Sequence, residues 1–201
     1  MSVQENRKRT LAEDRGRVPP RQLAHVVRRT ARVEELVRWY CTVLGAEVVH
    51  ADGMLAFLTY DDEHHRIAII GIPGLPEQPA MAAGTDHIAF SYANLGDLLY
   101  TFRRLEAVGI EPFWCINHGP TISMYYKDPD GSRVELQVDT MSSTEAIDRW
   151  MRSGAFADNP IGVVFDPKEL IVRYEAGEPI EQLTSRPPLP EGATPLDMLR
   201  F

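Results

Sequence analysis

The chain has little cysteine, no excess of basic charge and no long apolar run. Only two of its 201 residues are cysteines, Cys41 and Cys115, so no CxxC pair is present. A disulfide framework and a cysteine-rich zinc site are therefore excluded as organising features. Cys41 falls in an expected helix and Cys115 in an expected strand, and we expect two buried thiols in the reducing cytoplasm.

Acidic residues outnumber basic ones by 29 to 21, which gives a formal net charge of -8. Nucleic acids and anionic membranes bind basic surfaces, so neither partner is expected. No apolar run approaches the roughly 20 residues that cross a bilayer. The N-terminus has basic residues but no apolar stretch behind them, and a secretory signal is not expected. These absences together favour a cytoplasmic protein.

Three parts can be distinguished along the chain. Residues 1–20 are charged and lack periodicity, which predicts a mobile N-terminal arm. Residues 21–140 form the expected core domain. Residues 141–201 form a tail with short helices at about 144–153 and 167–176, followed from residue 179 by a proline-rich stretch expected to be extended. The tail carries no chemical motif, and it is long enough to wrap the core or a second subunit.

The core repeats one order of elements, which predicts an α+β fold of two βαβββ modules at about 21–72 and 84–140. A proline- and glycine-rich connector at 71–84 separates them. Each module begins with a strand, continues with a helix that a glycine ends, and closes with three strands. The expected strands are 23–28, 47–50, 55–60 and 66–70, then 86–91, 111–116, 121–127 and 133–138; the helices are 33–44 and 95–108.

The repeat extends to single residues. His25 and His87 occupy the same place at the start of each module, inside apolar runs. The last strand of the second module carries Glu135, whereas Ala68 stands at the corresponding position of the first. Two such modules can close on a shared core, and the cleft between them is a natural place for a metal ion.

The three side chains His25, His87 and Glu135 form the candidate metal site. A single histidine in an apolar strand is more often a hydrogen-bonded core residue than a ligand. Glu135 is different, because a carboxylate buried in Val-Glu-Leu-Gln-Val needs a partner or a cation. Two imidazoles and one carboxylate are the ligands of mononuclear non-haem Fe(II) centres with open coordination positions. Ala68 cannot add a fourth ligand, so the set suits Fe(II) or Mn(II), and a redox role favours iron.

The stretch from Ile116 to Glu135 carries a more specific pattern. It contains His118, a short spacer, an apolar residue with Tyr125, the turn Asp-Pro-Asp-Gly, and then Glu135. In this pattern the chain resembles the vicinal-oxygen-chelate superfamily and, within it, the type I extradiol ring-cleaving dioxygenases, over about residues 23–139. The resemblance implies a single vicinal-oxygen-chelate domain, a homo-oligomer, and Fe(II) held by His25, His87 and Glu135.

The same resemblance implies a substrate and further roles. An aromatic diol of the catechol type would be opened by O2 beside its two hydroxyl groups, to give a muconic-semialdehyde-type product. His65, just before Ile67-Ala68, would assist bound O2 and act as an acid and base. Tyr125 would hydrogen-bond a substrate oxygen, and His118 would contact the substrate from the rim of the cleft. For His65 the alternative is a solvated loop histidine, and for Tyr125 it is one more core aromatic residue.

The chain departs from the better-known dioxygenases, which carry two such domains where this chain has room for one. The spacer between His118 and Tyr125 is short, and the tail has no assigned counterpart. Two other functions of the superfamily stay open. One is an Mn-dependent thiol transferase acting on an epoxide antibiotic, and the other is a drug-binding module of the bleomycin-resistance type. A glyoxalase-type isomerase is disfavoured by Ala68.

Overall fold

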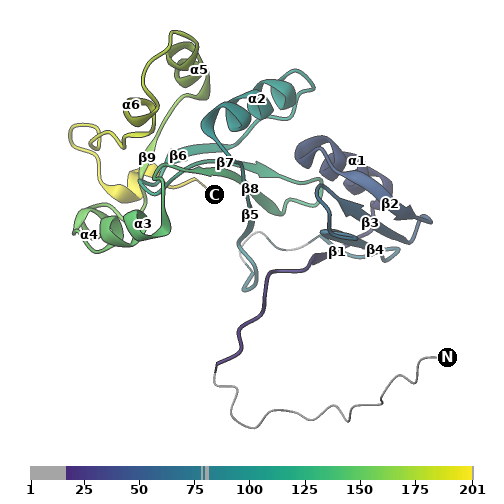
Figure 1. Ribbon diagram of the computed structural model, residues 1–201. Helices are drawn as coiled ribbons and strands as arrows, with labels where there is room; N and C mark the ends of the chain where they lie inside the picture. The colour runs from purple at the N-terminus through teal and green to yellow at the C-terminus, as the bar shows by residue number, and fades with distance from the viewer. Residues whose placement is uncertain (1–16, 78, 80–81, 201) are drawn as a thin grey trace, which may run out of the picture.

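A computed structural model describes residues 17–77, 79 and 82–200, and shows two βαβββ modules followed by a tail (Figure 1). In the first module a four-stranded sheet has the order β1-β4-β3-β2. β1 and β4 are parallel, and the other neighbours are antiparallel. The elements are β1 (Val26–Thr30), α1 (Val33–Leu44), β2 (Glu47–Ala51), β3 (Leu55–Thr59) and β4 (Ile67–Gly71).

The second module repeats this arrangement, and a strand from the tail extends its sheet. The order is β5-β8-β7-β6-β9, again with one parallel pair, β5 with β8. The elements are β5 (His87–Ser91), α2 (Leu95–Glu106), β6 (Trp114–Asn117), β7 (Thr121–Lys127) and β8 (Arg133–Asp139). β9 (Val163–Val164) pairs with the outer edge of β6.

The parallel pairs have equivalent registers in the two modules. Val27 lies opposite Ala68 in the first, and Ala89 lies opposite Glu135 in the second. His25 and His87 each stand two residues before these positions. The predicted correspondence of His25 with His87, and of Ala68 with Glu135, is therefore also a structural one.

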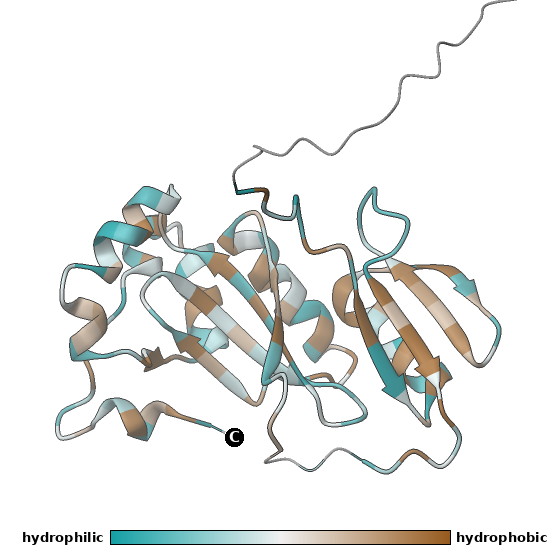
Figure 2. Cartoon of the chain, turned by 90° about the horizontal axis from the view of Figure 1, so that it is seen from below, coloured by the Kyte–Doolittle hydropathy of each residue, from teal (hydrophilic) through white to brown (hydrophobic). Residues whose placement is uncertain are grey.

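Alternating apolar side chains build a core between the sheets and their helices. In β8, Val134, Leu136 and Val138 are buried against α2, and in α1 Leu36, Tyr40 and Val43 face the first sheet. Hydrophobic residues accordingly gather along the strands in Figure 2. One alternating series thus faces the helices, which leaves the other series of each sheet for chemistry.

A charged contact joins the two modules at the Asp-Pro-Asp-Gly turn. Asp128 has a fully buried side chain, and its carboxylate accepts from Arg28 on β1 and from the hydroxyl of Tyr40 on α1, both at 3.2 Å. The backbone N–H groups of Asp130 and Ser132 also donate to Asp128. The first module therefore binds the turn that precedes β8, the strand carrying Glu135.

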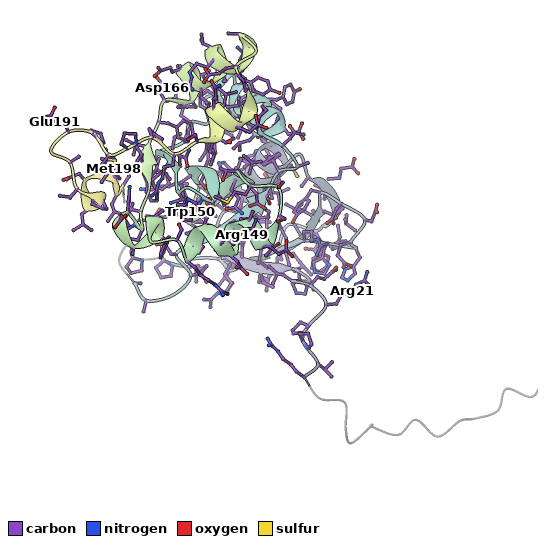
Figure 3. All side chains as sticks on the ribbon, turned by 60° about the vertical axis from the view of Figure 1, so that its left-hand side comes forward. Arg21, Arg149, Trp150, Asp166, Glu191 and Met198 are labelled. Atoms are coloured by element: carbon purple, nitrogen blue, oxygen red, sulfur yellow. The ribbon has the colours of Figure 1, made fainter. Side chains whose placement is uncertain are left out.

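The tail packs beside the second module, away from the first (Figures 1 and 3). α5 lies against α2, and Trp114 of β6 donates from its indole to the Met198 carbonyl in the tail at 2.9 Å. Trp150 and Met198 are both labelled in Figure 3. The tail elements are α3 (Thr144–Met151), α4 (Ala155–Asp158), β9, α5 (Pro167–Glu175), α6 (Ile180–Thr184) and the 3-10 turn Pro195–Met198.

Several expectations need correction. The stretch from residue 179 is not simply extended, because α6 begins directly after Pro179, where a missing N–H costs no helical hydrogen bond. The strand expected at 111–116 begins only at Trp114, since Pro112 cannot donate to a ladder. His25 precedes β1 instead of lying within a strand, because β1 begins to pair with β4 only at Val26.

Both cysteines are less buried than the sequence predicts. Cys41 and Cys115 are free and partly buried, not fully buried as expected, and burial raises the pKa of Cys115 to about 12. Residues 17–20 are exposed and form no helix or strand, while residues 1–16 of the expected arm lie outside the described residues. Within the described ranges, no helix combines the length and hydropathy needed to cross a bilayer.

Candidate active site

Three of the predicted site residues share one face of the second sheet. Glu135 on β8 lies directly opposite Tyr125 on β7 and opposite Ala89 on β5. His87 is two residues before Ala89, so alternation along β5 turns its side chain to the same face. Sequence alternation alone could not relate Tyr125 to Glu135 across the intervening turn, whereas the strand register does.

His87 and Glu135 are in direct contact. The Nε2 atom of His87 lies 2.9 Å from a carboxylate oxygen of Glu135, whose side chain is only 6% exposed. The hydrogen bond to Glu135 is the main reason that the pKa of His87 rises to about 9. Burial alone would raise the pKa of Glu135, but hydrogen bonds from His87 and Ser123 lower it overall. The pair is thus an ionised carboxylate beside a cation.

Asp86 orients the imidazole of His87 from the other side. Its carboxylate lies 2.8 Å from Nδ1 of His87, and it also pairs with Arg133 at 3.2 Å. A carboxylate on the second ring nitrogen is the usual partner of a metal-binding histidine, because it fixes the ring and directs the first nitrogen at the ion. His87 Nε2 is therefore held toward Glu135.

Tyr125 and His118 form a second pair beside the first. The Tyr125 hydroxyl is 3.1 Å from Nε2 of His118, and the Tyr125 ring meets His87 edge-on at 5.3 Å. Burial, reinforced by the charge of Glu135, raises the pKa of Tyr125, so the hydroxyl keeps its proton. Burial also lowers the pKa of His118, which is neutral near pH 7. Trp114 stacks on Tyr125 at 4.7 Å and stiffens the group.

His118 has a defined tautomer. Its Nδ1 atom hydrogen-bonds the carbonyl oxygen of Ile161 in the tail. A carbonyl only accepts, so Nδ1 carries the hydrogen and the neutral ring leaves Nε2 as an acceptor for Tyr125. Nothing in the sequence pointed to Ile161, because the tail shows no motif that relates it to the hairpin carrying His118.

His25 and His65 lie together in the first module. The His65 ring sits between His25 and Phe57, with centroid distances of 4.5 and 4.6 Å. His64 contacts it as well, with the two Nδ1 atoms 2.6 Å apart. Burial, with the neighbouring His25 and His64, lowers the pKa of His65, so this ring is neutral at pH 7. His25 is exposed and His65 is partly exposed.

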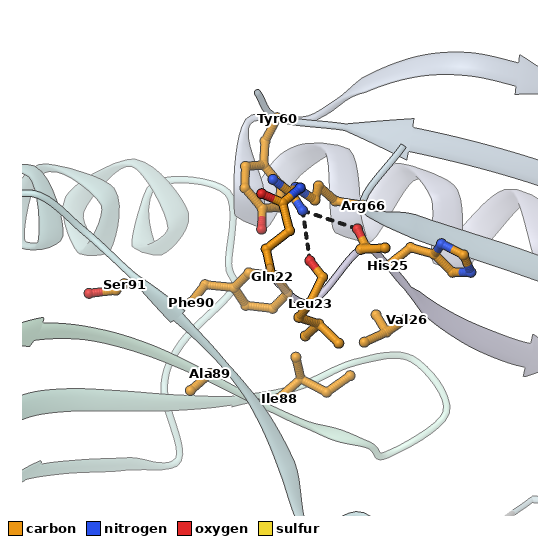
Figure 4. Close-up of a pocket in the computed structure, with 11 residues that line it drawn as sticks. Gln22, Leu23, His25, Val26, Tyr60, Arg66, Ile88, Ala89, Phe90 and Ser91 are labelled. Atoms are coloured by element: carbon orange, nitrogen blue, oxygen red, sulfur yellow. Dashed lines mark hydrogen bonds between the residues drawn. The ribbon is translucent and has the colours of Figure 1, made fainter. Parts of the chain in front are cut away.

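The two groups do not meet within one chain. Among the described residues, no three His, Cys, Asp or Glu side chains are close enough to hold a metal ion. A pocket of about 280 Å³ lies between the modules and includes His25. In Figure 4, however, the His25 ring points away from the pocket residues Ile88, Ala89 and Phe90 of β5. The sequence thus predicts three ligands. Within one chain only two of them, His87 and Glu135, are in contact.

Comparison with known proteins identifies the family of this chain. Residues 22–136 match the model of the Glyoxalase/Bleomycin resistance protein/Dioxygenase superfamily, which is more than half of the chain. The chain belongs to this superfamily. A solved dioxygenase-superfamily domain from Frankia sp. EAN1pec supports the fold, with a TM-score of 0.51 at 17% identity, covering 60% of this chain and 99% of that one.

Two curated members of the superfamily are much more similar in sequence. Biphenyl-2,3-diol 1,2-dioxygenase 2 of Rhodococcus globerulus is 44% identical over 82% of this chain and 87% of its own length. Biphenyl-2,3-diol 1,2-dioxygenase 3 of the same organism is 43% identical over 84% of this chain and 90% of its own. Both matches must include part of the tail, since they cover 166 and 171 residues and only 140 residues precede the tail.

Proposed function

We propose that this chain is an Fe(II)-dependent extradiol dioxygenase that opens a catechol-type ring beside its two hydroxyl groups. The observation that supports it best is the contact of His87 with Glu135, backed by the Tyr125–His118 pair on the same sheet face. The relatives at 43–44% identity act on biphenyl-2,3-diol, so a diol of that class is the substrate we propose. We place the protein in the cytoplasm, where its two free thiols remain reduced.

The donor set fits a divalent metal ion. A carboxylate as buried as Glu135 needs a positive charge, which protonated His87 supplies in the metal-free protein. A divalent ion held by His87 and Glu135 would take the place of that proton. When bound, Fe(II) would couple the diol to O2. No amino-acid side chain can supply this chemistry. Mn(II) is the alternative ion for the same ligands.

The surrounding residues would hold the diol and move its protons. Tyr125 keeps its hydroxyl proton and can donate it to a substrate oxygen, while His118 offers Nε2 behind it. His65 is a neutral imidazole and can accept or return a proton near pH 7. Trp114, stacked on Tyr125, would form one wall for a flat ring.

The third ligand requires a second copy of the chain in this proposal. His25 and His65 lie on an exposed part of the first module, and His87 and Glu135 lie on the second. In a homodimer with twofold symmetry, the first module of each copy can face the second module of the other copy, which creates two equivalent interfaces. Each of two equivalent sites would then receive His25 and His65 from one chain and the remaining residues from its partner.

Oxygen uptake tests the function directly. Protein purified anaerobically and loaded with Fe(II) should consume O2 with biphenyl-2,3-diol or catechol, and form a yellow product that absorbs visible light. Resorcinol, whose hydroxyls are not adjacent, is the matched control and should give no uptake. Failure with every adjacent diol of simple and biphenyl type would point to the thiol transferase or drug-binding functions instead.

Tyr125→Phe should separate binding of iron from turnover. The substitution removes one hydroxyl and keeps the ring stacked on Trp114, so His87 and Glu135 keep their contact. Iron content should stay at the wild-type level, while kcat falls by about 10²-fold, the usual scale for loss of one acid–base group. Metal analysis and an oxygen electrode measure the two quantities. An unchanged kcat would remove Tyr125 from the reaction.

A further inference from the structure

We propose that the C-terminal tail positions His118 for the reaction. Arg186 would do this by binding both the hairpin that carries His118 and the tail. The proposal rests on the proposed function only in giving His118 a task. Arg186 donates to three backbone carbonyl oxygens, those of His118 at 3.2 Å, Asn159 at 2.8 Å and Ala155 at 2.9 Å. One guanidinium thus joins the hairpin of the second sheet to the segment that follows α3.

Trp150 packs between Arg186 and the residue that follows His118. The guanidinium of Arg186 lies 4.9 Å from the centre of the Trp150 ring, in cation–π contact. Trp150 in turn packs on Gly119, where an added Cβ would lie only 2.3 Å from the indole, and Gly119 has a φ of +105°. The residue after His118 can therefore only be a glycine here, because the tail occupies the space of a side chain.

A chain of hydrogen bonds leads from Arg186 to the His118 ring. Arg186 holds the carbonyl of Asn159, and the Asn159 side chain accepts from the N–H of Ile161 at 3.1 Å and of Gly162 at 2.8 Å. The Ile161 carbonyl then receives the Nδ1 hydrogen of His118. The tail thus sets the place of the His118 backbone and the tautomer of its ring.

The hairpin itself has a matching contact with the tail. Asn117 donates from its side chain to the Thr184 carbonyl at 3.0 Å and accepts from the Gly119 N–H at 2.9 Å. Asn117 is buried, so these bonds hold the hairpin without competition from water. The backbone and the ring of His118 are consequently both held by residues beyond 140.

The test is Arg186→Met, which keeps an unbranched apolar stem and removes the five donors of the guanidinium. In metal-free protein with 15N-labelled histidine, we expect the wild-type His118 ring to give the signals of one neutral Nδ1–H tautomer. In the variant those signals should shift toward a mixture of tautomers. In Fe(II)-loaded protein kcat should fall about tenfold, with little change in KM, because a small displacement of a positioned group slows the step it serves.

Arg103→Met is the matched control. Arg103 on α2 also ties the tail to the second module, through an ion pair with Glu175 of α5 at 2.9 Å, but it does not touch His118. This variant should keep the His118 signals and kcat of the wild type. If Arg103→Met changes them as much as Arg186→Met, general loosening of the tail explains the effect and the proposal is wrong.

A second variant keeps the test decisive if Arg186→Met does not fold. Asn159→Ala removes the side chain that holds Ile161 and should give the same mixture of His118 tautomers as Arg186→Met. Folded Arg186→Met or folded Asn159→Ala protein with wild-type His118 signals would overturn the proposal. The nuclear magnetic resonance result does not depend on catalysis, so a failed dioxygenase assay would leave it standing.

Discussion

Mixing a His25→Ala protein with a Glu135→Ala protein should restore oxygen uptake that neither protein has alone. In the proposed homodimer, each variant lacks one of the proposed ligands in every site. In a mixed dimer, one site receives His25 and Glu135 from the two chains that still carry them, and the other site lacks both. With free exchange of subunits at equal concentrations, about a quarter of all sites should be intact, and activity should return to about that fraction of the wild type.

The control mixes His25→Ala with His65→Ala. These residues lie together in the first module, with ring centroids 4.5 Å apart, so both losses fall on the same half of the site. No arrangement of such chains brings intact His25 and His65 into one site, and no activity should return. If native mass spectrometry shows that subunits exchange and the first mixture still stays inactive, His25 does not act across a subunit boundary.

Glu135→Ala should abolish iron binding. Glu135 is the only carboxylate of the proposed ligand set, and its side chain is 6% exposed beside His87. Without it, two imidazoles remain to hold a divalent ion that prefers oxygen as well as nitrogen ligands. We expect iron content after anaerobic reconstitution and desalting to fall from about one ion per chain to the background, by at least 10²-fold in affinity.

Glu111→Ala provides the comparison for this loss. Glu111 is an exposed glutamate of the same module, before β6, and its removal changes the net charge equally. That variant should bind iron as the wild type does. Circular dichroism of both variants without metal must show the same folded content. Full iron occupancy in folded Glu135→Ala would contradict the ligand assignment.

Much of the fold could be predicted because both modules show the same local patterns of apolar spacing and helix-ending glycines. Gly45 ends α1 at a φ of +63°, and apolar positions at helical spacing mark α1, so its bounds agree with the prediction. The alternation around Glu135 likewise marks β8 as a strand with a buried carboxylate. These signals depend on neighbours within a few residues, which a single sequence records.

The rest depends on contacts between distant segments. The pairing of Tyr125 with Glu135 follows from the length of the turn between β7 and β8, and the Arg28–Asp128 contact joins residues a hundred positions apart. Arg186 resembles any charged residue of a proline-rich tail, yet it binds the His118 carbonyl. The separation of His25 from His87 within one chain also has no local signature, because the relative placement of two modules depends on packing between them.

The added strand β9 makes the two outer edges of the molecule unequal. β9 pairs with β6 along Ile116 and Asn117 and so becomes the edge strand of the second sheet, whereas β2 is an edge strand of the first sheet and all its residues are exposed. β9 spans only two residues and leaves few backbone N–H and C=O groups free at this edge, whereas the five residues of β2 leave more of them free to pair with another chain. The short strand that the tail contributes would thereby make this edge of the second sheet less prone than the β2 edge to aggregate with other chains.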